Sequence, residues 1–465
     1  MAHKTSLSLE NLVALGTEKL AQIILDETKA NAPFRKKVNA ALAGAKGPEA
    51  VAALIDRRLA ALEKARAMVA WEKEKDFAAD LAATVETIAK ELAQAAAAMA
   101  LERLLRFVDT HAKVFERIDD SSGRIQDVYW RAAKAAPELA QKLPEGERAG
   151  LAKRLTKSLD LDTHGLGAEI AIAIAPLLPG PALAAWDREL AKAGPEDHFI
   201  RVRQAVADAR GDLDAFLILE AQRPAWSQNP LRAAERLLAA GRLDEALDWA
   251  RRDHRGGVAY ASSADVAEGR IRRLHDVERV ALEARILEAQ GDKPSAQTLR
   301  WQAFAETLDP APLRDYLQKL GDFEEDDELA RAFAHVEASR QLYSALAFFI
   351  AWPHLDRAAK LVAAKAGQWD GQHYGALGRA ASALEEKFPL AASVLYRALL
   401  DDILKRGKSQ AYGHGARYLA QLETLAAEIE DWGGIADHAA YVTELRKSHG
   451  RKYGFWSLTE AKPKR

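Results

Sequence analysis

The amino-acid sequence predicts an all-α protein built from stacked helical hairpins, and three observations support this fold class. Apolar residues recur at spacings of three and four along nearly the whole chain, as they do on amphipathic helices. The stretch from Asn229 to Arg252 contains a complete helix–turn–helix. Residues 170–174 alternate isoleucine with alanine, but no second strand-like run could pair with them, so we expect a buried helix there and no β-sheet.

The N-terminal stretch, residues 1–160, is expected to form a helical domain that contains a long helical hairpin. A short helix near residues 9–15 should stop at Gly16, a second should follow from Thr17, and a third should begin at Pro33 and end near Gly44. Residues 49–120 then contain neither glycine nor proline, which is too long for one ordinary globular helix. We place a break near Lys75 and Asp76, where charged residues interrupt the apolar pattern.

A heptad seam follows this break. Its members alternate spacings of four and three: Leu81, Val85, Ile88, Leu92, Ala95 and Met99. Two interpretations remain open, namely an intramolecular hairpin between the two long helices and a coiled coil between two copies of the chain. The second makes a homodimer through the N-terminal helices an alternative.

Residues 161–181 contain the densest cluster of glycine and proline in the chain and are predicted to be a domain boundary. The remainder, residues 182–465, should form a helical-repeat domain. Its clearest unit starts with Asn229 as an N-cap and Pro230 at the first helical position, and Gly241 supplies the left-handed turn before the second helix. Leu231, Ala234 and Leu238 form one apolar stripe, and Leu243, Ala246, Leu247 and Ala250 form the other.

Neither helix can cover its own stripe, so such a pair must stack on similar pairs. The glycine-to-alanine spacing of five at Gly241–Ala246 returns at Gly291–Ala296, and weaker copies lie at 211–215, 388–392 and 432–436. This glycine and alanine pattern between two amphipathic helices resembles the core of the tetratricopeptide motif. The resemblance implies a tetratricopeptide-like α-solenoid with irregular repeat lengths.

The last stretch of the chain combines basic and aromatic residues. From Leu445 onward there are seven Lys or Arg against one Glu, a composition that nucleic acids select. Alternatively, Phe455 and Trp456 cap the open end of the solenoid and the charges are a solvated tail. The candidate partner-binding residues are Trp249, Arg252, Arg446, Lys447, His449, Arg451, Lys452, Tyr453 and Trp456.

A second resemblance rests on the end of the chain. Tyr441, Leu445, Phe455 and Leu458, with the intervening basic residues, look like the end of the helical-repeat region that accompanies SWIM-type zinc fingers in bacterial proteins. The opening residues 11–27 are similar to the start of an uncharacterised bacterial family with such repeats. A SWIM finger binds zinc through three cysteines and a histidine. This chain has no cysteine, so the resemblance implies the fold and neither the metal nor the nucleic-acid role.

Catalytic and cofactor motifs are not recognisable. Residues 406–409 lack the first glycine of a phosphate-binding loop, and Gly165 and Gly167 lack the third glycine of a dinucleotide fingerprint. The six carboxylates at 322–328 are expected to form a solvated helix start, with contact to a basic partner as the alternative. We therefore expect no catalytic residues, no metal and no cofactor, and an enzyme is the less favoured class.

Composition gives few hints of a partner. Lys plus Arg number 66 and Asp plus Glu 68, so the net charge of −2 does not indicate nucleic acid or membrane. We find no signal peptide and no membrane span, and expect a cytoplasmic protein. The function that the sequence favours is a non-catalytic scaffold binding a protein or peptide in the solenoid groove. The alternative is a nucleic-acid-associated protein that uses the C-terminal segment.

Overall fold

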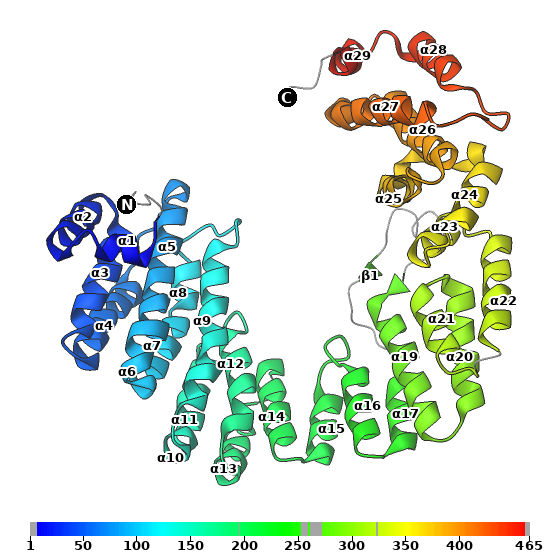
Figure 1. The fold of residues 1–465 in the computed structure, drawn as a ribbon. Helices are drawn as coiled ribbons and strands as arrows, with labels where there is room; N and C mark the ends of the chain where they lie inside the picture. Colours follow the sequence, from blue (N-terminus) through cyan, green and yellow to red (C-terminus); the bar gives the residue numbers. More distant parts are fainter. Residues whose placement is uncertain (1–6, 195, 253–258, 261–271, 322–323, 461–465) are drawn as a thin grey trace. The chain divides into compact units, whose positions relative to one another are not determined.

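The structure is a computed structural model that describes residues 7–194, 196–252, 259–260, 272–321 and 324–460. The chain divides into two compact units, Met1–Gln228 and Asn229–Arg465 (Figure 1). Helices make up nearly all the regular structure of the described residues, which confirms the all-α prediction. The strand pairing within them is one antiparallel ladder of two residues each, β1 (Ala259–Tyr260) with β2 (Arg272–Arg273), and one isolated bridge between Val69 and Ile118.

A large hydrophobic core of the first unit draws on residues 51–206. Its helices are α1 (Leu9–Val13), α2 (Thr17–Ala30), α3 (Ala32–Gly44), α4 (Pro48–Lys64), α5 (Glu74–Glu86), α6 (Ala93–Ala95), α7 (Ala97–Asp109), α8 (His111–Phe115), α9 (Arg124–Gln141), α10 (Glu145–Ala149), α11 (Leu151–Asp160), α12 (Leu166–Ile174), α13 (Gly180–Leu190), α14 (Asp197–Ala209) and α15 (Leu213–Gln222). Short 3-10 turns lie at Trp71–Lys73 and Ala175–Leu177, and a π-helical stretch, η2, at Thr87–Leu92.

The second unit contains α16 (Pro230–Ala239), α17 (Leu243–Ala250), α19 (Leu274–Ala289), α20 (Lys293–Thr307), α21 (Pro310–Leu317), α22 (Glu325–Ala338), α23 (Leu342–Ala351), α24 (Leu355–Ala364), α25 (Tyr374–Leu384), α26 (Pro389–Lys405), α27 (Tyr412–Ala426), α28 (His438–His449) and α29 (Tyr453–Glu460). Three 3-10 turns lie at Ala366–Gln368, Gly371–His373 and Ser409–Ala411. Most helices pack chiefly on the next helix along the chain, as in the pairs α16–α17, α19–α20 and α26–α27.

One turn recurs between consecutive helices. At α16–α17, Gly241 is left-handed (φ +73°) and the amide of Arg242 donates to the carbonyl of Leu237, five residues back, at 3.0 Å. The amides of Asp212, Asp292, His354 and Lys408 make the same bond to the carbonyls of Ala207, Leu287, Phe349 and Ile403. The expected hairpin at residue 241 is confirmed, and so is the one at residue 291. At residue 353 a proline stands in place of the glycine, so the glycine-to-alanine spacing of five did not predict that hairpin.

Ala246, Ala296 and Ala358 occupy the same place in three of these hairpins, and each is 0% exposed. A small residue there lets the second helix approach the first closely. In the expected stripe of α16, Leu231 and Ala234 are buried, but Leu237 is buried in place of Leu238, which is only partly covered. The prediction of a further repeat at 432–436 was wrong, because these residues lie in the irregular segment between α27 and α28 and no helix begins there.

The long N-terminal stretch breaks near the expected place. Helix α4 ends at Lys64, and α5 begins at Glu74. A second interruption falls at Ala96, which has extended rather than helical backbone (φ −153°, ψ 83°). The seam residues Leu81, Val85, Ile88 and Leu92 are buried in the core of the first unit. These four residues therefore serve the intramolecular packing and are not free to form a coiled coil with another copy.

The glycine- and proline-rich segment 161–181 lies inside the first unit. It forms the start of α13 and all of α12, whose Leu166, Ile170 and Ile174 belong to the core of that unit. Along the chain, the first compact unit ends at Gln228 and the second begins at Asn229. Among the described residues, no helix is long and apolar enough to cross a membrane.

Candidate functional site

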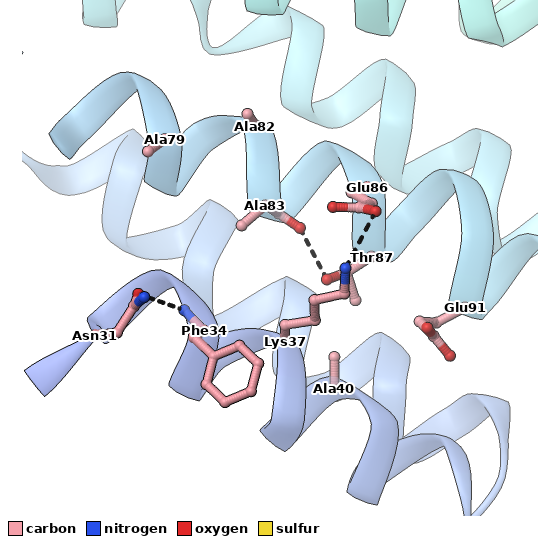
Figure 2. A pocket seen from close by; sticks show the side chains of 10 residues that line it. All are labelled: Asn31, Phe34, Lys37, Ala40, Ala79, Ala82, Ala83, Glu86, Thr87 and Glu91. Carbon is pink, nitrogen blue, oxygen red and sulfur yellow. Dashed lines mark hydrogen bonds and ion pairs between the residues drawn. The ribbon is translucent and has the colours of Figure 1, made fainter. Parts of the chain in front are cut away.

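One hollow in the first unit lies between α3 and the stretch formed by α5 and η2. It is an open groove with a volume of about 390 Å³. Figure 2 shows Phe34, Lys37 and Ala40 of α3 below and the side chains of α5 and η2 above. The groove is lined by Asn31, Phe34, Lys37, Ala40, Ala79, Ala82, Ala83, Glu86, Thr87 and Glu91.

The sequence of α5 explains why the groove is there. Leu81 and Val85 of α5 point into the core. The side of α5 that borders the groove carries the small residues Ala79, Ala82 and Ala83. With only methyl groups on this face, α3 and α5 leave space between them. The floor of the groove is therefore lined by the methyl groups of alanines.

The π-helical stretch adds to this shape. The hydroxyl of Thr87 donates to the carbonyl of Ala83 at 2.9 Å, where the helix widens (Figure 2). Such wide turns occur often at functional sites. On the other side of α3, a smaller hollow of about 110 Å³ is lined by residues from α3, α4 and the same turn of α5, including Arg58, Ala83 and Thr84. The turn from Ala83 to Thr87 thus borders both hollows.

Two charged residues on the rim of the groove, Lys37 and Glu86, form an ion pair. Lys37 lies 3.6 Å from Glu86, and Lys90 lies 2.8 Å from the same carboxylate. The hydrogen bond from Lys90 holds the pKa of Glu86 below its usual range. Lys36 and Arg58, which line the smaller hollow, both donate to Asp80, and burial lowers the pKa of Lys36. The groove therefore has a floor of alanines, with Glu86 on its rim paired to lysines.

The predicted C-terminal residues lie on α28, α29 and the turn between them. Phe455 and Trp456 are 0% and 6% exposed. The indole of Trp456 donates to the carbonyl of His449 at 3.0 Å, and the guanidinium of Arg446 lies 4.3 Å from the centre of the indole ring. Both rings are part of the core of the second unit, so neither is available to stack on a nucleobase.

The remaining C-terminal candidates are more accessible. Tyr453 is 78% exposed, and Arg451 is exposed as well. Lys447 pairs with Glu444 at 3.4 Å. Burial, with a smaller effect from the charge of Lys452, lowers the pKa of His449. The structure thus separates this segment into buried rings and exposed charges.

Trp249 and Arg252 form a pair of their own. The guanidinium of Arg252 lies 3.5 Å from the centre of the Trp249 ring, which is 6% exposed. They belong to the end of α17 and the residues after it, a different element from the other candidates.

The four acidic residues of the first turn of α22, Glu325–Glu328, fit the expected helix start. Asp322 of the same run lies outside the described residues.

A cluster around Arg397 was missed by the sequence analysis. Arg397 of α26 is 7% exposed and lies between the rings of Trp432 and Tyr441, 4.7 and 4.5 Å from their centres. Its guanidinium donates to the carbonyl of Ala436 at 2.6 Å, while Tyr441 donates to Asp401 at 2.7 Å. Burial raises the pKa of Asp401. These contacts fasten α28 and the segment before it to α26, and no local pattern could reveal partners 35 to 44 residues away.

Within the described residues, no group of three or more histidines or acidic residues could hold a metal ion. Fold and site together define an all-helical protein of sequentially packed hairpins with an apolar groove near its N-terminus. The chain belongs to the family of unknown function DUF6880, which it matches over residues 2–199 and 188–458. No curated protein and no solved structure matches it.

Proposed function

We propose that this protein is a non-catalytic scaffold, a tetratricopeptide-like α-solenoid that binds a protein or peptide partner. The groove between α3 and α5 carries this proposal. Its floor of alanines accepts the apolar face of an amphipathic helix, which is a common mode of peptide recognition. Its volume of about 390 Å³ lies within the range of ordinary binding pockets, roughly 300–1,000 Å³.

The recurring turns support the solenoid part of the proposal. Consecutive helices are joined by the same left-handed turn with a buried alanine at a fixed offset in three hairpins. Helices joined in this way pack in sequence order, as in helical-repeat proteins, whose extended surfaces serve as binding scaffolds.

A selection of displayed helical peptides against the full chain tests the groove. We expect the selected peptides to carry apolar residues at i, i+3 or i+4, and i+7, and to lose at least about tenfold in affinity on Ala82→Arg, which fills the groove with a long charged side chain. The matched control is Ala185→Arg, because Ala185 is an exposed alanine of α13 in the same unit. Peptides that bind the Ala82→Arg variant as tightly as the parent would rule out the groove.

Binding of nucleic acid through the C-terminal segment is the second candidate, supported by the exposed Arg451 and Tyr453. Contacts of Arg446, Lys447, Arg451 and Lys452 with phosphates would make binding fall steeply with salt, and replacing all four by alanine would flatten the log–log slope by up to about three or four. We expect no such salt-dependent binding, since the two rings best suited to stacking are buried.

A further inference from the structure

Helices α1 and α2 are barely covered by the rest of the first unit. Neither contains a buried residue, and in α2 only Leu20 and Thr28 are even partly covered. An isolated helix of this length is marginal in water, and most helices in proteins are stabilised by packing an apolar face. Something beyond α3 is therefore needed to hold this N-terminal hairpin in place.

The exposed surface here is strongly apolar. Seven large aliphatic side chains between residues 7 and 25 are exposed by 37% to 92%: Leu7, Leu9, Val13, Leu15, Ile23, Ile24 and Leu25. One partner contributes roughly 800 Å² to a standard interface, and these side chains supply aliphatic surface toward it from α1, α2 and the residues beside them. A monomer that left so much aliphatic surface in water would be prone to associate.

The charges of α2 indicate what covers it. Lys19, Ile23 and Glu27 are spaced i, i+4 and i+8 and therefore lie along one stripe of the helix. When two copies of α2 meet antiparallel with Ile23 at the two-fold axis, Lys19 of each copy lies opposite Glu27 of the other. A parallel arrangement would bring like charges together. A surface that forms a two-fold interface must be complementary to itself. The stripe of Lys19, Ile23 and Glu27 meets this requirement.

We propose that two copies of the chain form a homodimer in which their α2 helices pack antiparallel about Ile23. The interface lies on a surface different from the α3–α5 groove and does not depend on the proposed function. It also differs from the coiled coil considered from the sequence, because four of the six residues of that seam are buried within each copy.

The absence of cysteine from the chain allows a direct test. Ile23→Cys introduces the only thiol, and at a two-fold axis it faces its own copy within the 4.4–6.8 Å between Cα atoms that a disulfide usually spans. We expect mild oxidation at micromolar protein to give a linked dimer on a non-reducing gel. Ile218→Cys is the matched control: Ile218 is 60% exposed on α15, against 51% for Ile23, and should stay unlinked.

Sedimentation equilibrium supplies the second measurement. Ile23→Asp should raise the dimer dissociation constant at least about a hundredfold, because symmetry places the buried charge at the interface twice. Lys19→Glu should weaken the dimer, and the double change Lys19→Glu with Glu27→Lys should restore it. If Lys19→Glu acted by disturbing the fold, the second change would not restore the dimer. Since α2 has no buried residue, the variants should keep the core of the first unit, and circular dichroism should lose no more than the helical signal of α1 and α2.

A parent protein that sediments as a monomer at these concentrations overturns the proposal. So does an Ile23→Cys variant that links no faster than Ile218→Cys, or a charge reversal that the second change does not restore. Peptide binding in the α3–α5 groove is measured separately. A monomeric parent protein would therefore not contradict the proposed function, and the absence of peptide binding would not contradict the dimer.

Discussion

Ala246 is the residue whose environment follows most directly from local sequence. It stands five residues after a left-handed glycine, on the face of α17 that packs on α16, and it is fully buried. Ala296 and Ala358 are buried at the same place in their hairpins, although Pro353 stands where the glycine would be before Ala358. In these three hairpins the methyl group fits the space between two helices that are joined by a tight turn.

Replacing Ala246 by leucine should therefore overpack the crossing of α16 and α17. We expect a loss of roughly 1–3 kcal/mol in the free energy of unfolding, measured by the denaturant midpoint at unchanged slope. Ala239→Leu is the control, because Ala239 is exposed on α16 and should leave the midpoint nearly unmoved. Coincident midpoints for Ala246→Leu and the parent would mean that the crossing is looser than the structure indicates.

His438 makes a prediction about pH. Burial, and then the nearby charge of Arg397, lower its pKa below the usual 6.5, and the pKa of His449 is lowered as well. The unfolded chain therefore binds protons more readily than the folded one just below pH 6.5, so the folded state should lose stability as pH falls from about 7.5 to about 5.5. Asp401, whose pKa is raised by burial, works in the opposite direction at lower pH.

The contribution of His438 is isolated by substitution. Chemical denaturation across this range should show a weaker pH dependence for His438→Gln than for the parent, while His414→Gln, at an exposed position of α27, should follow the parent curve. An unchanged slope in His438→Gln would show that this histidine titrates alike in both states.

At the scale of the element, helix ends were predictable where capping and turn residues mark them. Asn229 accepts from the amide of Arg232 at 3.2 Å, Pro230 begins α16, and Gly241 ends the hairpin turn, all as expected from adjacent residues. The groove could not be predicted in the same way. The groove depends on Phe34 of α3 and Ala83 of α5 lining the same hollow. No pattern in the sequence predicts that α3 packs beside the alanine face of α5.

Helix α29 acts as the closing element of the second unit. It packs on α27 and inserts Phe455 and Trp456 into the core. Trp456→Ala should therefore cost roughly 3–5 kcal/mol of unfolding free energy, visible as a lower melting temperature.

Tyr453→Ala is the control for that measurement. Tyr453 is on the same helix and 78% exposed, so its loss should have little effect. Equal melting temperatures for the Trp456→Ala variant and the parent would contradict the capping role, and would leave the ring free for the nucleic-acid interpretation.

At the scale of the whole molecule, the glycine- and proline-rich segment shows the limit of composition as a guide. Residues that break helices mark the ends of elements, and an element can end inside a core. Leu166 and Ile174 are almost completely buried within the first unit, so the breakers around them shape the unit rather than divide it. The division after Gln228 carries no comparable cluster.

Each unit has its own core, so we expect residues 1–228 and 229–465 to fold when produced separately. Each fragment should give a helical circular dichroism spectrum and a cooperative unfolding transition. A fragment of residues 1–170 is the matched control: it cuts through α12 and removes core residues such as Ile174 and Trp186, so it should unfold without cooperativity. Cooperative folding of the control and not of residues 1–228 would favour the boundary at 161–181.

The recurring turn has a consequence for how the chain acquires its structure. Its defining bond joins residues only five positions apart, and in the second unit most helices pack on the next one along the chain. Native contacts are thus mostly of short sequence separation, and topologies of low contact order fold fast. During synthesis, each hairpin can close on the preceding one as soon as it leaves the ribosome, well before the last helix of the protein has been translated.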